Sequence, residues 1–360
     1  MMRAVLMLTL LVLPACRSVP IKTIMQGNMT MDGAMQMAGD MKMSGDMNMS
    51  GDVATSMKAD NSASRLAEIP VYSSTIPGSR KIAVIDVDGL LVNKPASGFG
   101  SMGENPVALF REKLDWVAAD PRVAAIVLRI NSPGGGVTAA DMMAQDLERL
   151  KHHRQIPVVA CVLDSGAGSG YYLASSADRI VAHPTSVVGG IGVILNLFRL
   201  DESLAQFNII PVTVKSGDHI DMASPMREMD EAEQVMFRSM ASEFHQRFID
   251  RVRSNRMVPE GSEAFDGRVV SGSTAKQLGL VDEVGYLDDA VQLARNLATL
   301  PADSGVVMLR RDNDRAHTLL DVTPNEPTSL LPINIPGFDR SKLPMFLYMW
   351  QPDPGLAART

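Results

Sequence analysis

Apolar segments that alternate with amphipathic ones are the feature that most constrains the fold of this chain. Three segments of strand length are almost continuously apolar, namely "KIAVIDVDGLLV" (81–92), "VAAIVLRINS" (123–132) and "IPVVACVLD" (156–164). Between the first two, "NPVALFREKLDWVAAD" (105–120) has helical spacing with Asn105 as its N-cap, and a second helix is predicted to end near Arg154. Strands that are apolar on both faces are buried beneath helices, so the sequence predicts an α/β fold with a mainly parallel sheet.

Composition narrows the class of protein further. Of the 360 residues, 46 % are hydrophobic and 21 % are charged, with a formal net charge of −7. That is enough to bury one large core, and it argues against a nucleic-acid partner, which would need a clustered basic face. The two cysteines exclude a disulfide framework.

The first sixteen residues, "MMRAVLMLTLLVLPAC", have the order of a secretory leader. Arg3 precedes an apolar run, Ala4–Leu13, that is too short to span a bilayer of roughly 30 Å. Leu13-Pro14-Ala15-Cys16 resembles a bacterial lipobox, in which the cysteine is acylated. We therefore expect a lipoprotein of the bacterial cell envelope, anchored to a membrane and facing the periplasm or the exterior. The alternative is an ordinary leader in which Cys16 is incidental.

Residues 17–75 are predicted to form a disordered tether. A six-residue period begins at Met29, as "MTMDGA", "MQMAGD", "MKMSGD" and "MNMSGD", and it contains no aliphatic stripe that could build a core. Thioethers are ligands that suit Cu(I), so copper binding is the alternative to a plain spacer. The candidate ligands are Met35, Met37, Met41 and Met43.

The folded domain is expected over 80–300, followed by a proline-rich tail over 301–360. Seven prolines between Pro324 and Pro354 argue against regular structure there. The aromatic segment "LPMFLYMWQP" (343–352) suits either a bilayer interface or packing back on the domain. Within the domain, a long helix is expected before residue 256. Its apolar stripe predicts core or a subunit contact, and consists of Phe237, Met240, Phe244, Phe248 and Val252.

Five motifs between residues 130 and 285 resemble the signal peptide peptidase A family. They are "INSPGGGV" (130–137), "GSGYYLASSADRI" (168–180), "VVGGIGVI" (187–194), "VKSGDHIDMASPMREM" (214–229) and "GRVVSGSTAKQLGLVDEVG" (267–285). The resemblance covers about 81–298. It implies a membrane-associated serine peptidase with the ClpP/crotonase-like fold of repeated β-β-α units, which acts on extended peptides. It also implies a homo- or hetero-oligomeric ring in which nucleophile and base can come from different subunits.

The resemblance assigns the glycine-rich loop to an oxyanion hole. The family's loop supplies a backbone N–H, which corresponds here to Gly135 or Gly136. Glycine allows the backbone to approach a substrate carbonyl and to aim N–H groups at developing negative charge. A tight strand-to-helix turn that needs positive φ is the alternative reason for these glycines.

The resemblance also locates the catalytic dyad, and both of its positions are altered. Alignment on Tyr171 and Tyr172 places the family's nucleophilic serine at Gly168, and the family's general-base lysine corresponds to Ile220. Glycine has no hydroxyl that could attack a substrate, and isoleucine cannot accept a proton. A base is needed because a serine hydroxyl is a weak nucleophile unless a base takes its proton.

Neighbouring groups offer substitutes for the dyad. Ser169 and His219 stand one position from the expected sites, and Lys215 is a further candidate base. One residue along a helix turns a side chain by about 100°, so both shifts would have to compensate each other. His183 is more typical of a structural histidine.

Other kinds of site find less support. Asp164, Asp178 and Asp221 lack the spacing of a metal site, and "GGIGVI" lacks the acidic partner of a dinucleotide fold. No cofactor is expected.

Four functions therefore stay open. The first is a peptide-binding pseudopeptidase, as scaffold or regulatory ring subunit. The second is an active serine peptidase that cleaves signal or membrane-released peptides through Ser169. The third is an acyl-CoA enzyme of the crotonase type, disfavoured by export, and the fourth is copper handling by the tether.

Overall fold

The computed structural model describes residues 65–74, 78–94, 104–197, 199–311, 318–320 and 346–350, and the backbone of two short strands near the N-terminus. These two strands, β1 (Met43–Ser44) and β2 (Asp46–Met47), pair antiparallel within a separate unit, residues 1–56. Cys16, Met35, Met37 and Met41 lie outside the described residues, and of Met43 only the backbone is described.

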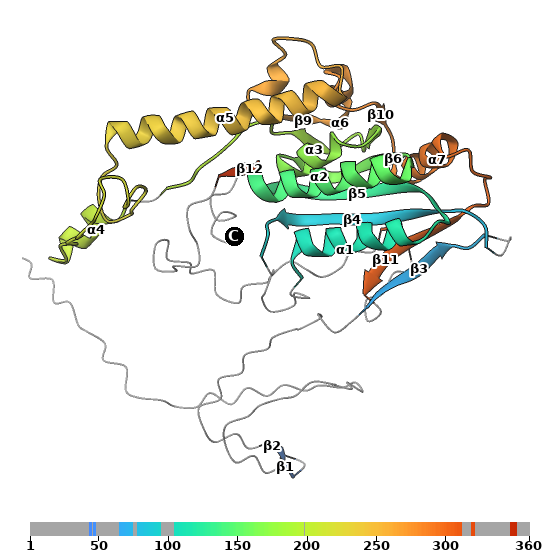
Figure 1. Ribbon diagram of the computed structural model, residues 1–360, viewed down its shortest axis with the longest axis horizontal. Helices are drawn as coiled ribbons and strands as arrows, with labels where there is room; N and C mark the ends of the chain where they lie inside the picture. The colour runs from blue at the N-terminus through green and yellow to red at the C-terminus, as the bar shows by residue number, and fades with distance from the viewer. Residues whose placement is uncertain are drawn as a thin grey trace, which may run out of the picture. The chain divides into compact units, whose positions relative to one another are not determined.

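The second unit is built on a mainly parallel sheet (Figure 1). Its strands lie in the order β10-β7-β6-β5-β4-β11-β3, and every pair along this path is parallel except β11 with β3. The bounds are β3 (Leu66–Tyr72), β4 (Lys81–Leu91), β5 (Val123–Gly136), β6 (Val158–Ala167), β7 (Arg179–Ala182), β10 (Glu283–Val284) and β11 (Gly305–Arg311). The α/β class with a mainly parallel sheet, predicted from the sequence, is confirmed.

Helices cover both faces of this sheet. Along β5, Ile126 and Leu128 face a core shared with the helices α1, α2 and α3, while Ala125 and Val127 face a second core under α7. This alternation explains why the strand is apolar throughout. The helix bounds are α1 (Pro106–Ala119), α2 (Val137–Arg154), α3 (Ser169–Ala174), α4 (Asp201–Gln206), α5 (Glu231–Asn255), α6 (Gly272–Gln277) and α7 (Leu287–Leu297), with a 3₁₀ turn at Glu263–Phe265.

Local sequence sets the helix ends. Asn105 caps α1 as predicted, because its side-chain oxygen accepts from the N–H groups of Val107 and Ala108 at 3.0 and 3.3 Å. Asp230 forms a capping box with Glu233 at the start of α5. Only the last part of the α5 stripe is fully buried, through Phe248 and Val252.

Long strands change partners along their length, and this brings their ends to one place. The first half of β6 pairs with β7, whereas Ser165–Ala167 pairs with β8 (Val187–Gly189), which in turn pairs antiparallel with β9 (Val269–Ser271). β5 shows a register shift between Ile130 and Ser132, beyond which its glycine-rich end pairs with β12 (Leu347–Met349).

Two segments lie in the sheet although the sequence placed them outside the domain. β3 falls in the expected tether and β11 in the expected tail, and the two form the antiparallel edge of the sheet. Pro70 is tolerated in β3 because an edge strand does not need every N–H. The expectation of no regular structure between Pro324 and Pro354 is wrong at β12, whose residues are buried. Of the two alternatives for the aromatic segment, the part described packs on the domain.

Among the described residues, no helix combines the length and the apolar character needed to cross a bilayer.

Candidate functional site

A sharp turn joins β6 to α3 at Gly168. Its φ of 51° and ψ of −121° are strained for any residue with a side chain, and its N–H donates to the carbonyl of Gly189 at 3.0 Å. Hydrolases hold a nucleophile at such strand-to-helix turns because the strained residue then projects its side chain into the site. A Cβ added to Gly168 would lie 2.1 Å from the carbonyl oxygen of Tyr348 and 2.5 Å from its carbonyl carbon. The turn therefore aims at a peptide carbonyl, but it carries no side chain.

Ser169 is the first residue of α3 and is fully buried. Its hydroxyl donates to the carbonyl oxygen of Tyr348 at 3.2 Å. Within the described residues, no histidine, lysine or carboxylate forms a hydrogen bond with this hydroxyl. Ser169 thus contacts the carbonyl without a base to activate it.

The glycine loop at the end of β5 faces the same carbonyl. Gly134, Gly135 and Gly136 pair antiparallel with Met349, Tyr348 and Leu347 respectively. A Cβ on Gly134 would lie 2.2 Å from the Tyr348 oxygen, so only glycine permits this approach. Ser132 fixes the loop by donating to the carbonyl of Gly89 at 2.6 Å and accepting from Gly134 N–H at 3.2 Å.

The alternation of hydrogen-bonded pairs between β5 and β12 identifies the loop N–H that faces the carbonyl of Tyr348. Val137 N–H donates to Phe346 at 3.2 Å, and Trp350 N–H donates to Pro133 at 3.0 Å. Hydrogen-bonded pairs alternate along an antiparallel ladder, so the pair midway between these two, Gly135 with Tyr348, lies in the bonded phase. Of the two loop glycines predicted to supply an oxyanion N–H, the geometry favours Gly135.

The opposite edge of β12 is held as well. Leu347 exchanges two backbone hydrogen bonds with Ile194, of 2.9 and 3.0 Å. The strand thus lies between the glycine loop and Ile194, with backbone bonds on both sides. Sequence reasoning missed this contact because the strand is short and stands in a proline-rich segment.

The predicted base positions are not brought to Ser169. Lys215 donates to Asp221 at 3.0 Å and to the carbonyl of Asp218 at 2.9 Å. His219 is exposed and Ile220 is 74 % exposed, and in the part of the chain that the structure describes no hydrogen bond or ion pair links either residue to Ser169.

His183 and Asp178, two further residues considered from the sequence, make contacts with neighbouring parts of the fold. His183 shares a 2.8 Å hydrogen bond with Thr185 and packs edge-on against Tyr286. Asp178 accepts from Val158 N–H at 2.7 Å. Within the described ranges, no group of three metal-ligating side chains occurs.

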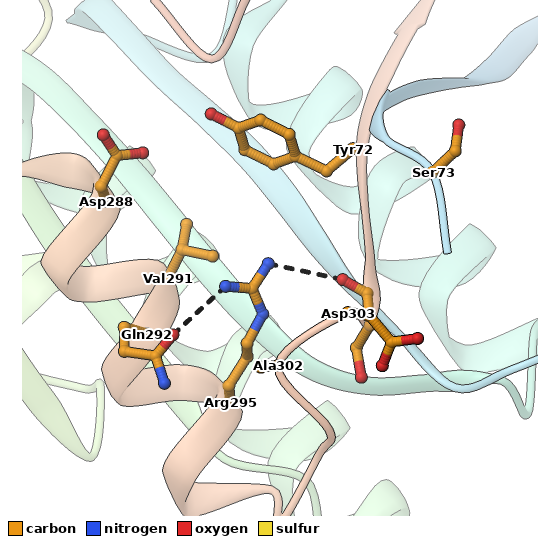
Figure 2. Close-up of a pocket in the computed structure, with 9 residues that line it drawn as sticks. Tyr72, Ser73, Asp288, Val291, Gln292, Arg295, Ala302 and Asp303 are labelled. Atoms are coloured by element: carbon orange, nitrogen blue, oxygen red, sulfur yellow. Dashed lines mark hydrogen bonds between the residues drawn. The ribbon is translucent and has the colours of Figure 1, made fainter. Parts of the chain in front are cut away.

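A separate hollow lies beside α7, away from the glycine loop. Its volume is about 410 Å³, and Figure 2 shows Arg295 reaching across it. Arg295 donates to Gln292 at 3.3 Å and to the carbonyl of Ser304 at 3.4 Å. None of its lining residues comes from β5, α3 or β12, so it shares no residue with the carbonyl site.

Comparison with known proteins shows that the chain is similar to peptidases. The model of peptidase family S49 matches residues 151–301. A putative protease of Synechocystis sp. is 32 % identical over 226 residues, which are 62 % of this chain and 76 % of the relative. A putative signal peptide peptidase of Enterococcus faecium is 28 % identical over 65 % of this chain and 68 % of its own length. Protease 4 of Haemophilus influenzae is 26 % identical, and the chain covers 41 % of it.

Among solved structures, a membrane-bound stomatin-specific protease in complex with a substrate peptide is 14 % identical with a TM-score of 0.38, over 66 % of this chain and 94 % of its own.

Proposed function

The chain belongs to peptidase family S49, the signal peptide peptidase A family, and we propose that it serves there as a peptide-binding member without peptidase activity. The observation that carries this proposal is Gly168. Its backbone has the strained conformation of a nucleophile turn, and the direction of its missing side chain leads to a peptide carbonyl. The attacking oxygen is absent from the position that is built for it.

The second missing group is the proton acceptor. Ile220 stands where the family resemblance places a lysine, and an aliphatic side chain cannot take a proton. Assembly into a ring of identical subunits would not restore it, because each copy would bring the same isoleucine to its neighbour.

Peptide binding is supported by the way the site holds β12. Both edges of that strand are bound through backbone groups, from the glycine loop on one side and from Ile194 on the other. Pairing by strand addition depends little on sequence, and therefore suits a groove for extended peptides.

One observation favours the second candidate, an active peptidase that uses Ser169. Its hydroxyl is 3.2 Å from the carbonyl oxygen of Tyr348. The contact is that of a donor to the oxygen, however, and an attacking hydroxyl must present its own oxygen to the carbonyl carbon. We therefore assign Ser169 the part of a second donor to the carbonyl, beside Gly135.

An oligomer and an envelope location complete the proposal. The segment after α4 exposes Ile210, Val212 and Val214, and several exposed aliphatic side chains within one short segment favour a subunit contact. The leader and Cys16 support attachment to a bacterial membrane by a lipid, where signal peptides and other membrane-released peptides would be the ligands.

Reconstitution tests the proposal. Gly168→Ser combined with Ile220→Lys restores both groups when a neighbouring subunit of the proposed ring brings its lysine to the turn, because Ile220 is exposed and is not linked to Ser169 within one chain. We expect this double variant to hydrolyse a peptide library that the wild-type chain leaves intact. Each single variant serves as the matched control and should stay inactive. Hydrolysis by the wild-type chain, lost in Ser169→Ala, would refute the proposal and support the second candidate.

A further inference from the structure

One face of α7 lines the hollow beside the antiparallel edge of the sheet. Asp288, the adjacent Val291 and Gln292, and Arg295 follow one another at helical spacing, so they share a single stripe of the helix. Tyr72 at the end of β3 and the loop before β11 line the other side (Figure 2). The volume of about 410 Å³ falls in the range of ligand pockets, roughly 300–1,000 Å³.

Arg295 brings a positive charge into this hollow and has only neutral partners there. Its guanidinium donates to Gln292 at 3.3 Å and to the main-chain carbonyl of Ser304 at 3.4 Å, both of which are long for hydrogen bonds. Its Nε is buried and has no acceptor among the described residues. Because a guanidinium has five N–H donors in a fork that matches a carboxylate, Arg295 retains the capacity to bind one.

A carboxylate stands at the other end of the same helix face. Asp288 is exposed, and within the part of the chain that the structure describes it forms no hydrogen bond or ion pair. Its neighbour Asp289, by contrast, accepts from the N–H of Tyr286 at 2.8 Å. Two helical turns separate Asp288 from Arg295, about 10.5 Å along the axis. The hollow thus carries opposite charges at its two ends.

Tyr72 supplies an apolar surface beside the two charges. The residue is 47 % exposed, although it belongs to a strand of the sheet. Figure 2 shows its ring extending from β3 towards α7, on the side opposite Val291. An exposed aromatic face inside a hollow suits the packing of an apolar or aromatic group of a ligand.

The balance of charge selects among ligands. Asp303 also lines the hollow, so two carboxylates and one guanidinium surround it. A dianion such as phosphate would meet net repulsion there, and a simple cation would leave Arg295 without a counter-charge. A zwitterion satisfies both ends. An amino acid or a dipeptide with one hydrogen bond at each end spans roughly 9–13 Å, which includes the separation of Asp288 and Arg295 along α7.

We propose that this hollow binds a free amino acid or a dipeptide with an apolar side chain, as a zwitterion. The carboxylate of the ligand binds Arg295, its ammonium group binds Asp288, and its side chain packs on Tyr72. The inference does not depend on the proposed function, because the hollow shares no residue with the carbonyl site. It gives the chain a second recognition site, which binds the charged ends of a small ligand instead of an extended backbone.

Isothermal titration calorimetry of the full chain with phenylalanine and with alanyl-phenylalanine tests the site, and the tighter of the two identifies the ligand length. We expect the N-acetylated and the C-amidated forms of that ligand to bind at least tenfold more weakly, because each lacks one charge. Equal binding of the capped and uncapped forms would overturn the proposal. So would the absence of binding by both compounds at millimolar concentration.

Two variants assign each charge of the ligand to its partner. Arg295→Gln should weaken binding of the zwitterion at least tenfold and remove the preference over the amidated form, while the preference over the acetylated form remains. Asp288→Asn should show the reverse pattern. Arg149→Gln removes an exposed arginine of α2, on the other face of the sheet from α7, and as the matched control should bind like wild type. Unchanged binding in Arg295→Gln and Asp288→Asn would place the ligand elsewhere and overturn the proposal.

A conservative variant guards against a folding defect in Arg295→Gln. Arg295→Lys keeps the positive charge and loses the fork of donors, so it should weaken binding only a few fold and retain the preference for a free carboxylate. If Arg295→Lys and Arg295→Gln bound the zwitterion and its amidated form alike, the positive charge would have no part in binding, and the proposal would be wrong.

Discussion

The hydroxyl of Ser169 donates a 3.2 Å hydrogen bond to the carbonyl oxygen of Tyr348, 179 residues further along the chain. This contact joins the strand-to-helix turn of a peptidase fold to a strand from the C-terminal segment. It places a peptide bond of the chain itself against the turn at Gly168. A nucleophile at this turn would therefore face the bond between Tyr348 and Met349.

Restoring the dyad should cut the chain at this bond. In Gly168→Ser/Ile220→Lys the strand β12 must shift away from the turn, because a Cβ at position 168 would lie 2.1 Å from the carbonyl oxygen of Tyr348 and 2.5 Å from its carbon. While the shifted strand stays in the groove, the new serine faces the carbonyl of Tyr348. We expect slow cleavage between Tyr348 and Met349, seen by intact-mass spectrometry as loss of residues 349–360. Gly168→Ala/Ile220→Lys brings the same bulk without the hydroxyl and should stay intact. A cut at any other bond would contradict the geometry.

Removing the Ser169 hydroxyl should loosen the strand without changing any catalysis. Ser169→Ala deletes one buried hydrogen bond, for which we expect a loss of about 1 kcal/mol in unfolding free energy. Amide hydrogen exchange at Leu347 and Met349 should accelerate, since these residues form β12. Ser175→Ala also removes a buried hydroxyl, which donates to Tyr172, and should leave exchange in β12 unchanged. Unaltered exchange in Ser169→Ala would show that this bond does not hold the strand.

The exposed apolar segment should carry a subunit contact. Val212 and Val214 are 86 % and 96 % exposed, and charges at these positions would be solvated in a monomer but costly in an interface. We expect the wild-type chain to be oligomeric by light scattering, and Val212→Glu/Val214→Lys to shift it to monomer with the same melting temperature. An unchanged mass for the double variant would exclude this segment from the contact.

The carboxyl group of Asp88, a residue of strand β4, should make the free energy of unfolding depend on pH. Burial and the neighbouring Asp86 raise the pKa of Asp88 to about 6, although Arg129 lies 3.6 Å away. The unfolded value is about 3.9, so between these pH values the folded chain binds more protons and loses stability as pH rises. The variant Asp88→Asn has no carboxyl group to ionise at this position, so it should not lose stability in this way.

Urea denaturation at two pH values measures the effect. We compare the unfolding free energy of Asp88→Asn minus that of wild type at the two pH values. This difference should be about 2 kcal/mol larger at pH 7.5 than at pH 4, because each unit of pKa shift corresponds to 1.36 kcal/mol. The comparison between pH values cancels any packing change that the amide causes. The same difference at both pH values would show that Asp88 does not titrate in this window.

The central sheet could be predicted because the residue pattern within each of its strands identifies that segment as a buried strand. The segments that became β4, β5 and β6 are apolar on both faces, and Asn105 marks the start of α1 by a local contact. Such features depend on neighbours in sequence. The edge pair β3 and β11 depends instead on a partner more than two hundred residues away, and neither strand shows a pattern that announces the other.

The candidate site was predictable in its loops and not in its occupant. Gly135 and Gly168 follow from motifs, since close backbone approach demands glycine. The strand at Leu347–Met349 is too short to show periodicity, and nearby prolines predict irregular structure. The contacts of Tyr348 with Tyr172 and Phe248 arise from packing of α3 against α5, which local sequence does not encode.

Covalent labelling of the wild-type chain with a fluorophosphonate, which reacts only with an activated serine, decides whether the chain retains a nucleophile. We expect no labelling of the native chain, because no base among the described residues contacts Ser169 and position 168 has no hydroxyl. Gly168→Ser/Ile220→Lys should label as the positive control. Stoichiometric labelling of the wild-type chain at Ser169, abolished by Ser169→Ala, would show instead that the chain is an active peptidase.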